Sequence, residues 1–312
     1  MKLMGAGRLL MVLVLSGMAS LQGRAAALVL RSASALVQDQ RTGELLVQKK
    51  VNDILPIASL TKLVTSMVVL DAKLDPNEQL TILEEDKDVL RHSHSRLPVG
   101  TRLSREQAML LALMASENRA AHALGRTYPG GLDLFIVAMN AKAHAMGLKE
   151  TRFGDPAGLS SSNVSSALDL ARIVDTAHQY AQIRAFSTTP EAEITSGRST
   201  LSFHNTNMLI RSPKWQIGLS KTGFINESGQ CLVMQAEMAH RPVLIVLLDA
   251  TGRHSRFDDA NRIRTWLEGP DPIASHQVQR VKATLGRPHH RQLKARARLQ
   301  HHPRAQRHHR RR

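Results

Sequence analysis

The chain has 312 residues, 42% hydrophobic and 22% charged, and its 42 lysines and arginines against 26 acids give a formal net charge of +16. This charge lies at the ends: three cations fall in residues 1–27 and twelve after Asp271, which leaves 27 cations and all 26 acids in residues 28–271. A nucleic-acid partner is therefore not expected, because the cations of such a domain should gather on its folded surface.

The N-terminus has the layout of a secretory signal peptide. Lys2 and Arg8 precede an apolar run, and small residues then lead to three alanines that end at Ala27. The apolar run is only about a dozen residues long, whereas a membrane-spanning helix needs roughly 20. We predict export across a membrane and cleavage near Ala27. The single cysteine, Cys231, excludes both a lipid-modified N-terminal cysteine and an internal disulfide.

Residues 28–271 are predicted to form one folded domain. They begin with a β-hairpin whose turn contains Gly43. Apolar residues at helical spacing then predict four helices, over residues 59–71, 104–124, 132–147 and 165–180. Three strands and a last helix follow, over residues 216–221, 231–238, 243–248 and 255–267. This order is typical of an α+β fold, in which helices from both chain ends cover a mostly antiparallel sheet. We expect Cys231 to be a buried core residue.

The segment 272–312 is basic, rich in histidine and free of acidic residues. Such a composition predicts a disordered tail. Its cations would suit contact with an anionic membrane or envelope polymer, with an affinity that falls as the salt concentration rises. The alternative is a solvated extension without a partner.

Three short motifs follow one another along the chain: Ser59-Leu60-Thr61-Lys62, Ser116-Glu117-Asn118 and Lys221-Thr222-Gly223. Singly, each has an ordinary structural interpretation, as a helix cap, a helix surface and a strand end. Their order, spacing and context together favour a chemical role.

The first motif pairs a nucleophile with a base. A serine hydroxyl becomes a nucleophile when a neighbouring base takes its proton, and the three-residue spacing puts Lys62 on the helix face of Ser59. Lys62 needs a lowered pKa for this task, which burial and the charge of Lys221 would supply. The helix N-terminus at Ser59 favours the negative charge that develops in acyl transfer. Ser116 is suited to relay a proton to a leaving amine.

The remaining motif residues are suited to binding a substrate. Asn118 offers an amide donor and acceptor to a peptide. Lys221 and Thr222 would attract an anionic group, while Gly223 lets a ligand lie against the strand. The N–H of Phe224 would complete an oxyanion hole with the N–H of Ser59. This chemistry requires no metal or organic cofactor.

The motif set S-x-x-K, S-x-N and K-T-G is the known signature of serine enzymes that react with penicillin. The chain resembles the low-molecular-mass penicillin-binding proteins, the D-alanyl-D-alanine peptidases that act on bacterial peptidoglycan. The resemblance covers residues 32–267 and includes further matching runs at residues 56–63, 116–121, 153–160 with Asn163, 204–207 and 221–227. It implies a penicillin-binding/β-lactamase-like transpeptidase fold, with a five-stranded sheet, helices on both faces and a helical subdomain that carries Ser116 and Asn118. It also implies an acyl-enzyme at Ser59, a peptidoglycan peptide as substrate and inhibition by β-lactams.

Two details resemble the endopeptidase branch of this family, which cleaves D-alanyl–diaminopimelyl cross-links. Glu117 stands between the serine and the asparagine of the second motif, and Phe224 follows Gly223 where carboxypeptidases often carry histidine. About 45 residues follow Leu267, fewer than the β-rich second domain that carboxypeptidases of this group commonly add. A D-alanyl-D-alanine carboxypeptidase remains the alternative.

Two other functions are less compatible with the sequence. A β-lactamase shares the acylation chemistry but also needs a group that activates the deacylating water, and no E-x-x-x-N sequence lies between Asn118 and Lys221. A non-catalytic wall-binding protein on the same fold would not need the complete motif set.

Overall fold

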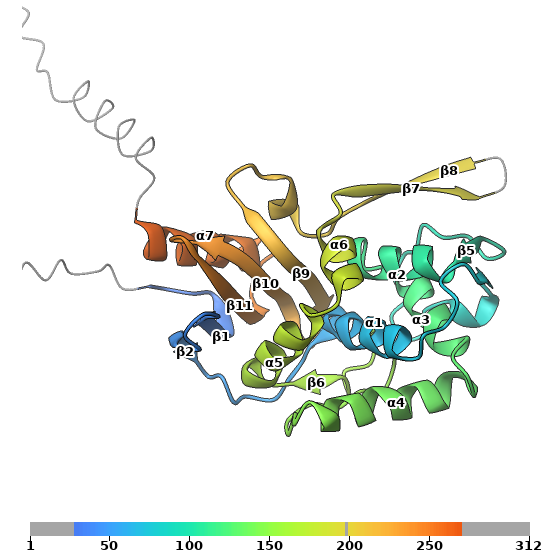
Figure 1. Cartoon of the computed structure of the whole chain (residues 1–312), viewed down its shortest axis with the longest axis horizontal. Coiled ribbons are helices and arrows are strands. Elements are labelled where there is room, and N and C mark those ends of the chain that lie inside the picture. Colours follow the sequence, from blue (N-terminus) through green and yellow to red (C-terminus); the bar gives the residue numbers. More distant parts are fainter. Residues whose placement is uncertain (1–27, 197–198, 270–312) are drawn as a thin grey trace, which may run out of the picture. The chain divides into compact units, whose positions relative to one another are not determined.

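The computed structural model describes residues 28–196 and 199–269, so the predicted signal peptide and the predicted basic tail lie outside the described residues. A five-stranded antiparallel sheet of order β2-β1-β11-β10-β9 forms the centre (Figure 1). Its strands are β1 (Ser32–Asp39), β2 (Leu45–Lys49), β9 (Gln216–Ile225), β10 (Gly229–Met238) and β11 (Arg241–Ala250). The predicted hairpin, the three later strands and the α+β class are therefore confirmed.

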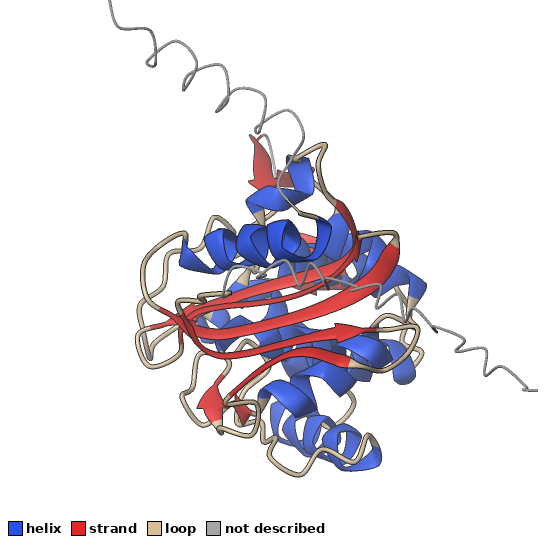
Figure 2. Ribbon diagram, turned by 90° about the vertical axis from the view of Figure 1, so that its left-hand side faces the viewer, coloured by secondary structure: helices blue, strands red, loops and turns tan. Residues whose placement is uncertain are grey.

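The sheet is buried on both faces, as Figure 2 shows from its side view. Along β11, Ile245 and Leu247 belong to one apolar cluster while Leu244 and Val246 belong to another, because successive strand residues point to opposite faces. The first face is covered by α7 (Ser255–Glu268). The second face carries the other helices: α1 (Lys62–Asp71), α2 (Arg105–Met114), α3 (Asn118–Arg126), α4 (Gly131–Ala145), α5 (Ala167–Ala177) and α6 (Ala181–Thr188).

Short elements complete the described part of the chain. They are the strand pairs β3 (Leu55–Pro56) with β6 (Val164–Ser165), β4 (Gln79–Thr81) with β5 (Arg102–Ser104) and β7 (Glu191–Ser196) with β8 (Ser199–His204), and the 3-10 turns η1 (Ala58–Thr61), η2 (Glu84–Asp86) and η3 (Met208–Arg211). The β7–β8 hairpin extends away from the sheet in Figure 1. None of these pairs was predicted; the strands of the first two pairs have only two or three residues each, too few to show a period. In the described residues no helix is long and apolar enough to cross a membrane.

The predicted helix over residues 104–124 is wrong at its centre. It is two helices, α2 and α3, separated by a break at Ser116, whose φ of +58° lies in the left-handed region that L-residues rarely adopt. Glu117 caps α3, since its carboxylate accepts a hydrogen bond from the N–H of Arg119 at 3.3 Å. The apolar period runs through the break because both helices pack on the same core. The break takes Ser116 out of the helix and into the site.

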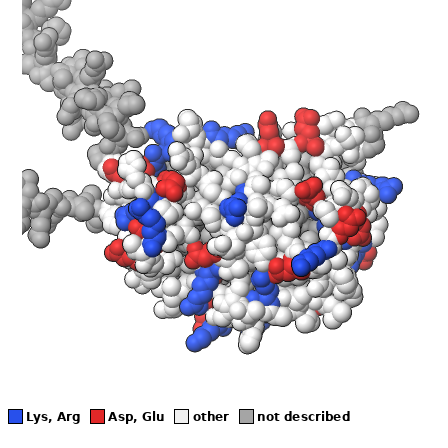
Figure 3. All heavy atoms as spheres, in the orientation of Figure 1, with Lys and Arg blue, Asp and Glu red and all other residues white. Residues whose placement is uncertain are grey.

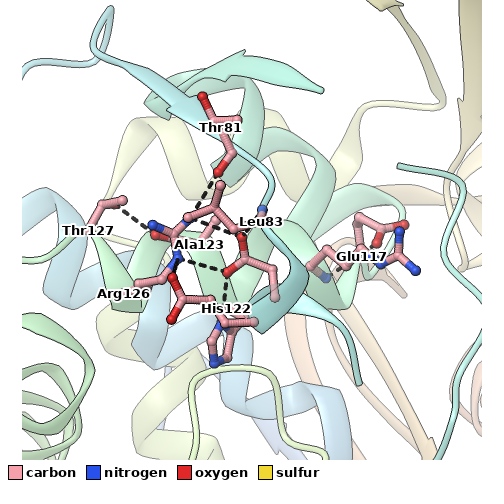
Figure 4. A network of polar contacts seen from close by, with 10 residues as sticks. Thr81, Leu83, Glu117, His122, Ala123, Arg126 and Thr127 are labelled. Atoms are coloured by element: carbon pink, nitrogen blue, oxygen red, sulfur yellow. Dashed lines mark hydrogen bonds and ion pairs between the residues drawn. The ribbon is translucent and has the colours of Figure 1, made fainter. Parts of the chain in front are cut away.

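A buried carboxylate fixes α3 to the preceding chain (Figure 4). Asp86 in η2 accepts two hydrogen bonds from Arg126, at 3.0 and 2.9 Å, and lies 2.8 Å from Nδ1 of His122. Burial raises the pKa of Asp86, but the bonds from His122 and Arg126 outweigh it and hold the pKa below its usual value. This network anchors η2 and therefore the start of the segment 88–97, which borders the site.

Candidate active site

Ser59 lies in the turn η1, which continues directly into α1, so a helix begins at this serine as predicted. Ser59 is not the helix cap, because the capping position is Ile57 and no side chain caps the turn. The Ser59 hydroxyl instead donates to the carbonyl of Ala157 at 3.3 Å and accepts a hydrogen bond from Nζ of Lys62 at 2.7 Å. The three-residue spacing therefore brings the serine and lysine into direct contact.

Lys62 is completely buried. Besides Ser59, its Nζ donates to Oδ1 of Asn118 at 2.8 Å and to the carbonyl of Ala157 at 2.6 Å. Burial lowers the pKa of Lys62 to about 7, although the carboxylates of Asp155, Glu117 and Asp88 act in the opposite direction. Near neutral pH this lysine therefore exists in both protonation states.

A second serine–lysine pair lies beside the first. Nζ of Lys221, on β9, donates to the hydroxyl of Ser116 at 2.8 Å and to the carbonyl of Thr222 at 2.9 Å. Lys221 is 1% exposed, and its pKa is lowered well below the usual value by burial and by the charges of Lys62 and Arg256. The sequence predicted repulsion between the two lysines, and the charge of Lys62 lowers the pKa of Lys221.

Asn118 connects Lys62 to the segment 88–97. Its amide oxygen accepts the bond from Lys62, and its Nδ2 donates to the hydroxyl of Ser93 at 2.9 Å. Next to it, the hydroxyl of Ser95 donates to the Glu117 carboxylate at 2.5 Å. The amide is thus oriented by the protein before a peptide arrives.

The same segment also contacts the end of β9. Nη1 of Arg91 lies 2.7 Å from the carboxylate of Glu227, in the turn between β9 and β10. Arg91 also donates to the carbonyl of Leu159. The helical region and the sheet are therefore joined at one end of the site, through a glutamate that the sequence had marked only as part of a resemblance.

Gly223 is needed for a reason other than the predicted one. A Cβ at this position would lie 2.8 Å from the carbonyl of Ile57 and 3.2 Å from the N–H nitrogen of Ser59. A Cβ at Gly158 would come within 2.0 Å of the carbonyl of Ala58. The turn that holds Ser59 is therefore packed between two glycines, and the space beside Gly223 is taken by the protein itself rather than kept for a ligand.

Thr222 and Phe224 alternate with Lys221 and Gly223 along β9, so their side chains point to the other face of the sheet. The hydroxyl of Thr222 lies 2.6 Å from that of Thr206, and the Phe224 side chain is 54% exposed. β9 is an edge strand, paired only with β10. Its second edge faces the Ser59 turn, which is the arrangement that an oxyanion hole between Ser59 and Phe224 requires.

Sequence reasoning gave no role to Asp155, which fixes the loop that carries the carbonyl of Ala157. Its carboxylate accepts hydrogen bonds from four backbone N–H groups that follow it: Ala157 (2.7 Å), Gly158 (2.6 Å), Leu159 (3.2 Å) and Ser160 (2.8 Å). Asn163 holds the same loop, because its Nδ2 donates to the hydroxyl of Thr61 at 3.0 Å. This loop brings the carbonyl of Ala157 to Lys62. The only signal for it in the sequence was the matching run 153–160 with Asn163.

The residues predicted for the site lie on three segments, 59–62, 116–118 and 221–224. The structure joins Ser59, Lys62 and Asn118 by hydrogen bonds, and likewise Ser116 and Lys221. Cys231 is fully buried, as predicted, and burial raises the pKa of its thiol to about 11. Among the described residues, no group of three histidine, cysteine or acidic side chains is placed to hold a metal ion.

Comparisons with known proteins agree on one family. Residues 22–252 match the family model described as D-alanyl-D-alanine carboxypeptidase. The chain is 47% identical over 268 residues to a D-alanyl-D-alanine endopeptidase of Pseudomonas aeruginosa, covering 83% of this chain and 86% of that protein. It is 43% identical over 258 residues to one of Escherichia coli, covering 81% and 83%. The crystal structure of a Streptomyces DD-transpeptidase superimposes with a TM-score of 0.71 at 26% identity, covering 76% of this chain and 97% of that one.

Proposed function

Because the chain belongs to the D-alanyl-D-alanine carboxypeptidase family of peptidases, we propose that it is a serine DD-endopeptidase that cleaves D-alanyl–diaminopimelyl cross-links of peptidoglycan. The observation that carries the proposal is the 2.7 Å contact between the hydroxyl of Ser59 and Nζ of the buried Lys62, whose pKa is about 7. The endopeptidase names of the relatives at 47% and 43% identity favour this reaction over the release of a terminal D-alanine.

Acylation proceeds through the Ser59–Lys62 pair. Neutral Lys62 accepts the proton of Ser59 while the serine oxygen attacks the carbonyl carbon of D-alanine. The N–H groups of Ser59 and Phe224 stabilise the oxyanion that forms. As the C–N bond breaks, Ser116 gives its proton to the departing amine and takes another from Lys221, 2.8 Å away. The D-alanyl group is then an ester on Ser59.

Hydrolysis completes the reaction. Lys62 releases the proton it took from Ser59 to solvent and then accepts a proton from the water whose oxygen attacks the ester carbon. As the ester bond breaks, Lys62 gives this proton to the oxygen of Ser59, and Lys221 regains its proton from solvent. The product is a free D-alanyl carboxyl group, and Ser59 is restored. Asn118 positions the peptide, while Lys221 and Thr222 attract the carboxylate next to the scissile nitrogen. A β-lactam acylates Ser59 by the same first step, and the enzyme is therefore penicillin-sensitive.

The test is incubation of the mature protein with purified cross-linked dimeric and monomeric muropeptides, followed by mass spectrometry of the products. We expect dimers to be converted to monomers by the wild-type enzyme and not by Ser59→Ala. If terminal D-alanine is lost while dimers survive, the protein is a carboxypeptidase and the endopeptidase proposal fails. Turnover of nitrocefin faster than about one per second would instead indicate a β-lactamase.

We further propose that the enzyme works in the periplasm after removal of residues 1–27, and that residues 272–312 hold it near anionic membrane or envelope polymers. The proposal is supported by the near balance of charge in residues 28–271 and by the mixed charges on the surface shown in Figure 3. Deletion of residues 273–312 should lower the fraction bound to cell envelopes at low salt. An unchanged fraction would contradict the role of the tail.

A further inference from the structure

A cavity of about 390 Å³ lies between the segment 205–211, the end of β9 and the beginning of α7. Three arginines line it, Arg211, Arg253 and Arg256, and no acidic side chain does. Phe224, more than half exposed, forms part of its apolar wall. The side chains that line this cavity have no role in the acylation and hydrolysis steps at Ser59.

The arginines of this cavity have unused hydrogen-bonding capacity. Arg211 and Arg253 are exposed and form no hydrogen bond or ion pair with the residues that the structure describes. Arg256 donates to the carbonyl of Gly223 at 2.9 Å, but its Nε is buried without a partner. A buried donor without an acceptor is unfavourable, and guanidinium groups suit carboxylates. The cavity is therefore complementary to an anionic ligand.

The cavity adjoins the part of the site that faces the leaving group. Thr206 lines it and contacts Thr222, and Arg256 holds the carbonyl of Gly223. The carboxylate that Thr222 attracts belongs to the residue that carries the scissile nitrogen. In a cross-link this residue is diaminopimelate, which continues into a second stem peptide with further carboxylates, whereas in a carboxypeptidase reaction it is a single alanine.

We infer that this cavity is the subsite for the amine half of the cross-link, in which Arg211 and Arg253 bind carboxylates of the second stem peptide and Phe224 packs against its methylene groups. The inference rests on the proposed endopeptidase function and names the part of the substrate that distinguishes it from D-alanine release. It makes Arg211 and Arg253 specificity residues, since neither contacts the reacting atoms.

The experiment measures two reactions in the same variants, Arg211→Ala, Arg253→Ala and the double variant. The first is kcat/KM for cleavage of a cross-linked muropeptide dimer, and the second is the rate constant for acylation by benzylpenicillin, which lacks a second stem peptide. Each single variant loses one charge-assisted hydrogen bond, which is expected to lower kcat/KM for the dimer about fivefold. In the double variant we expect kcat/KM for the dimer to fall about 20-fold. Arg102→Ala, an exposed arginine on β5, is the matched control.

The ratio of the two rates decides the inference. We expect dimer cleavage by the double variant to fall at least fivefold more than acylation, mostly through KM, and the deficit to shrink at high salt because wild-type binding weakens. An unchanged dimer kcat/KM, or an equal fall in both reactions, would overturn the subsite. A wild-type enzyme that is acylated by penicillin but leaves dimers intact would instead refute the proposed function.

Discussion

The site contains two serine–lysine pairs of nearly equal geometry and different surroundings. Ser59 and Lys62 are 2.7 Å apart within one helical turn, and Ser116 and Lys221 are 2.8 Å apart between a helix break and a strand. Both lysines are buried. Three carboxylates raise the pKa of Lys62 against the effect of burial, whereas neighbouring cations lower the pKa of Lys221 further.

This difference teaches how one site can contain two lysines with separate tasks. A lysine with a pKa of about 7 both accepts and releases a proton near neutral pH, which is the requirement for a general base. Lys221, whose pKa is also lowered by burial, donates a hydrogen bond to Ser116 at 2.8 Å and is placed to replace the proton that Ser116 gives to the leaving amine. Burial lowers both pKa values, whereas the nearby charges act in opposite directions on the two lysines.

Removal of the Ser59 hydroxyl is expected to have the largest effect on acylation. Ser59→Ala removes the nucleophile and is expected to abolish covalent labelling by a fluorescent penicillin. Ser66→Ala, about two turns further along the chain, removes a hydroxyl that bonds only to the carbonyl of Lys62 and is the control that keeps the label. Labelling of the Ser59 variant would show that another residue is the nucleophile.

Replacement of Lys62 tests which lysine acts as the base in acylation. Lys62→Met removes the base and is expected to lower the acylation rate constant about 10³-fold to 10⁴-fold. Lys142→Met, which disturbs an ion pair with Asp71 away from the site, should change it less than twofold. The measurement is stopped-flow acylation at pH 8. A small effect at Lys62 would assign the base to Lys221.

The second pair is expected to matter less. Ser116→Ala removes the proton donor to the leaving amine and should lower kcat for peptide cleavage about 10²-fold, and Lys221→Met should do the same. Because the two residues act as one relay, the double variant is expected to be little worse than either single variant. Multiplicative losses would contradict a shared proton path.

The smallest expected effect is a displacement of the pH profile. Neutral Lys62 is the reactive form, so the acylation rate should fall about tenfold per pH unit below pH 7 and level off above it. Glu117→Gln keeps the acceptor for Ser95 but removes a charge that raises the pKa of Lys62. The fall of the acylation rate should therefore begin at a lower pH in this variant. Glu106→Gln, an exposed acid on α2, should leave it in place.

Much of the fold followed from periodicity, and the errors have physical causes. The strands β9, β10 and β11 were predicted because short runs of residues typical of strands replace the helical period there. The break between α2 and α3 was missed because a residue in the left-handed conformation does not change the spacing of apolar residues. The residue at this position is Ser116 and not a glycine, which would have indicated a break. The role of Gly158 was missed because Ala58, against which it packs, lies 100 residues earlier in the chain. The role of Asp155 was missed because its bonds to the N–H groups that follow form only in the folded conformation of this loop.

The sequence by itself determined the Ser59–Lys62 pair, because three residues on a helix fix the contact locally whatever the rest of the chain does. It also determined the separation of charge between the central domain and the ends. Only the tertiary structure decided that Lys221 meets Ser116, 105 residues away, and that arginines from η3 and the start of α7 line one cavity. Long-range contacts depend on how strands and helices pack, which spacing along the chain does not encode.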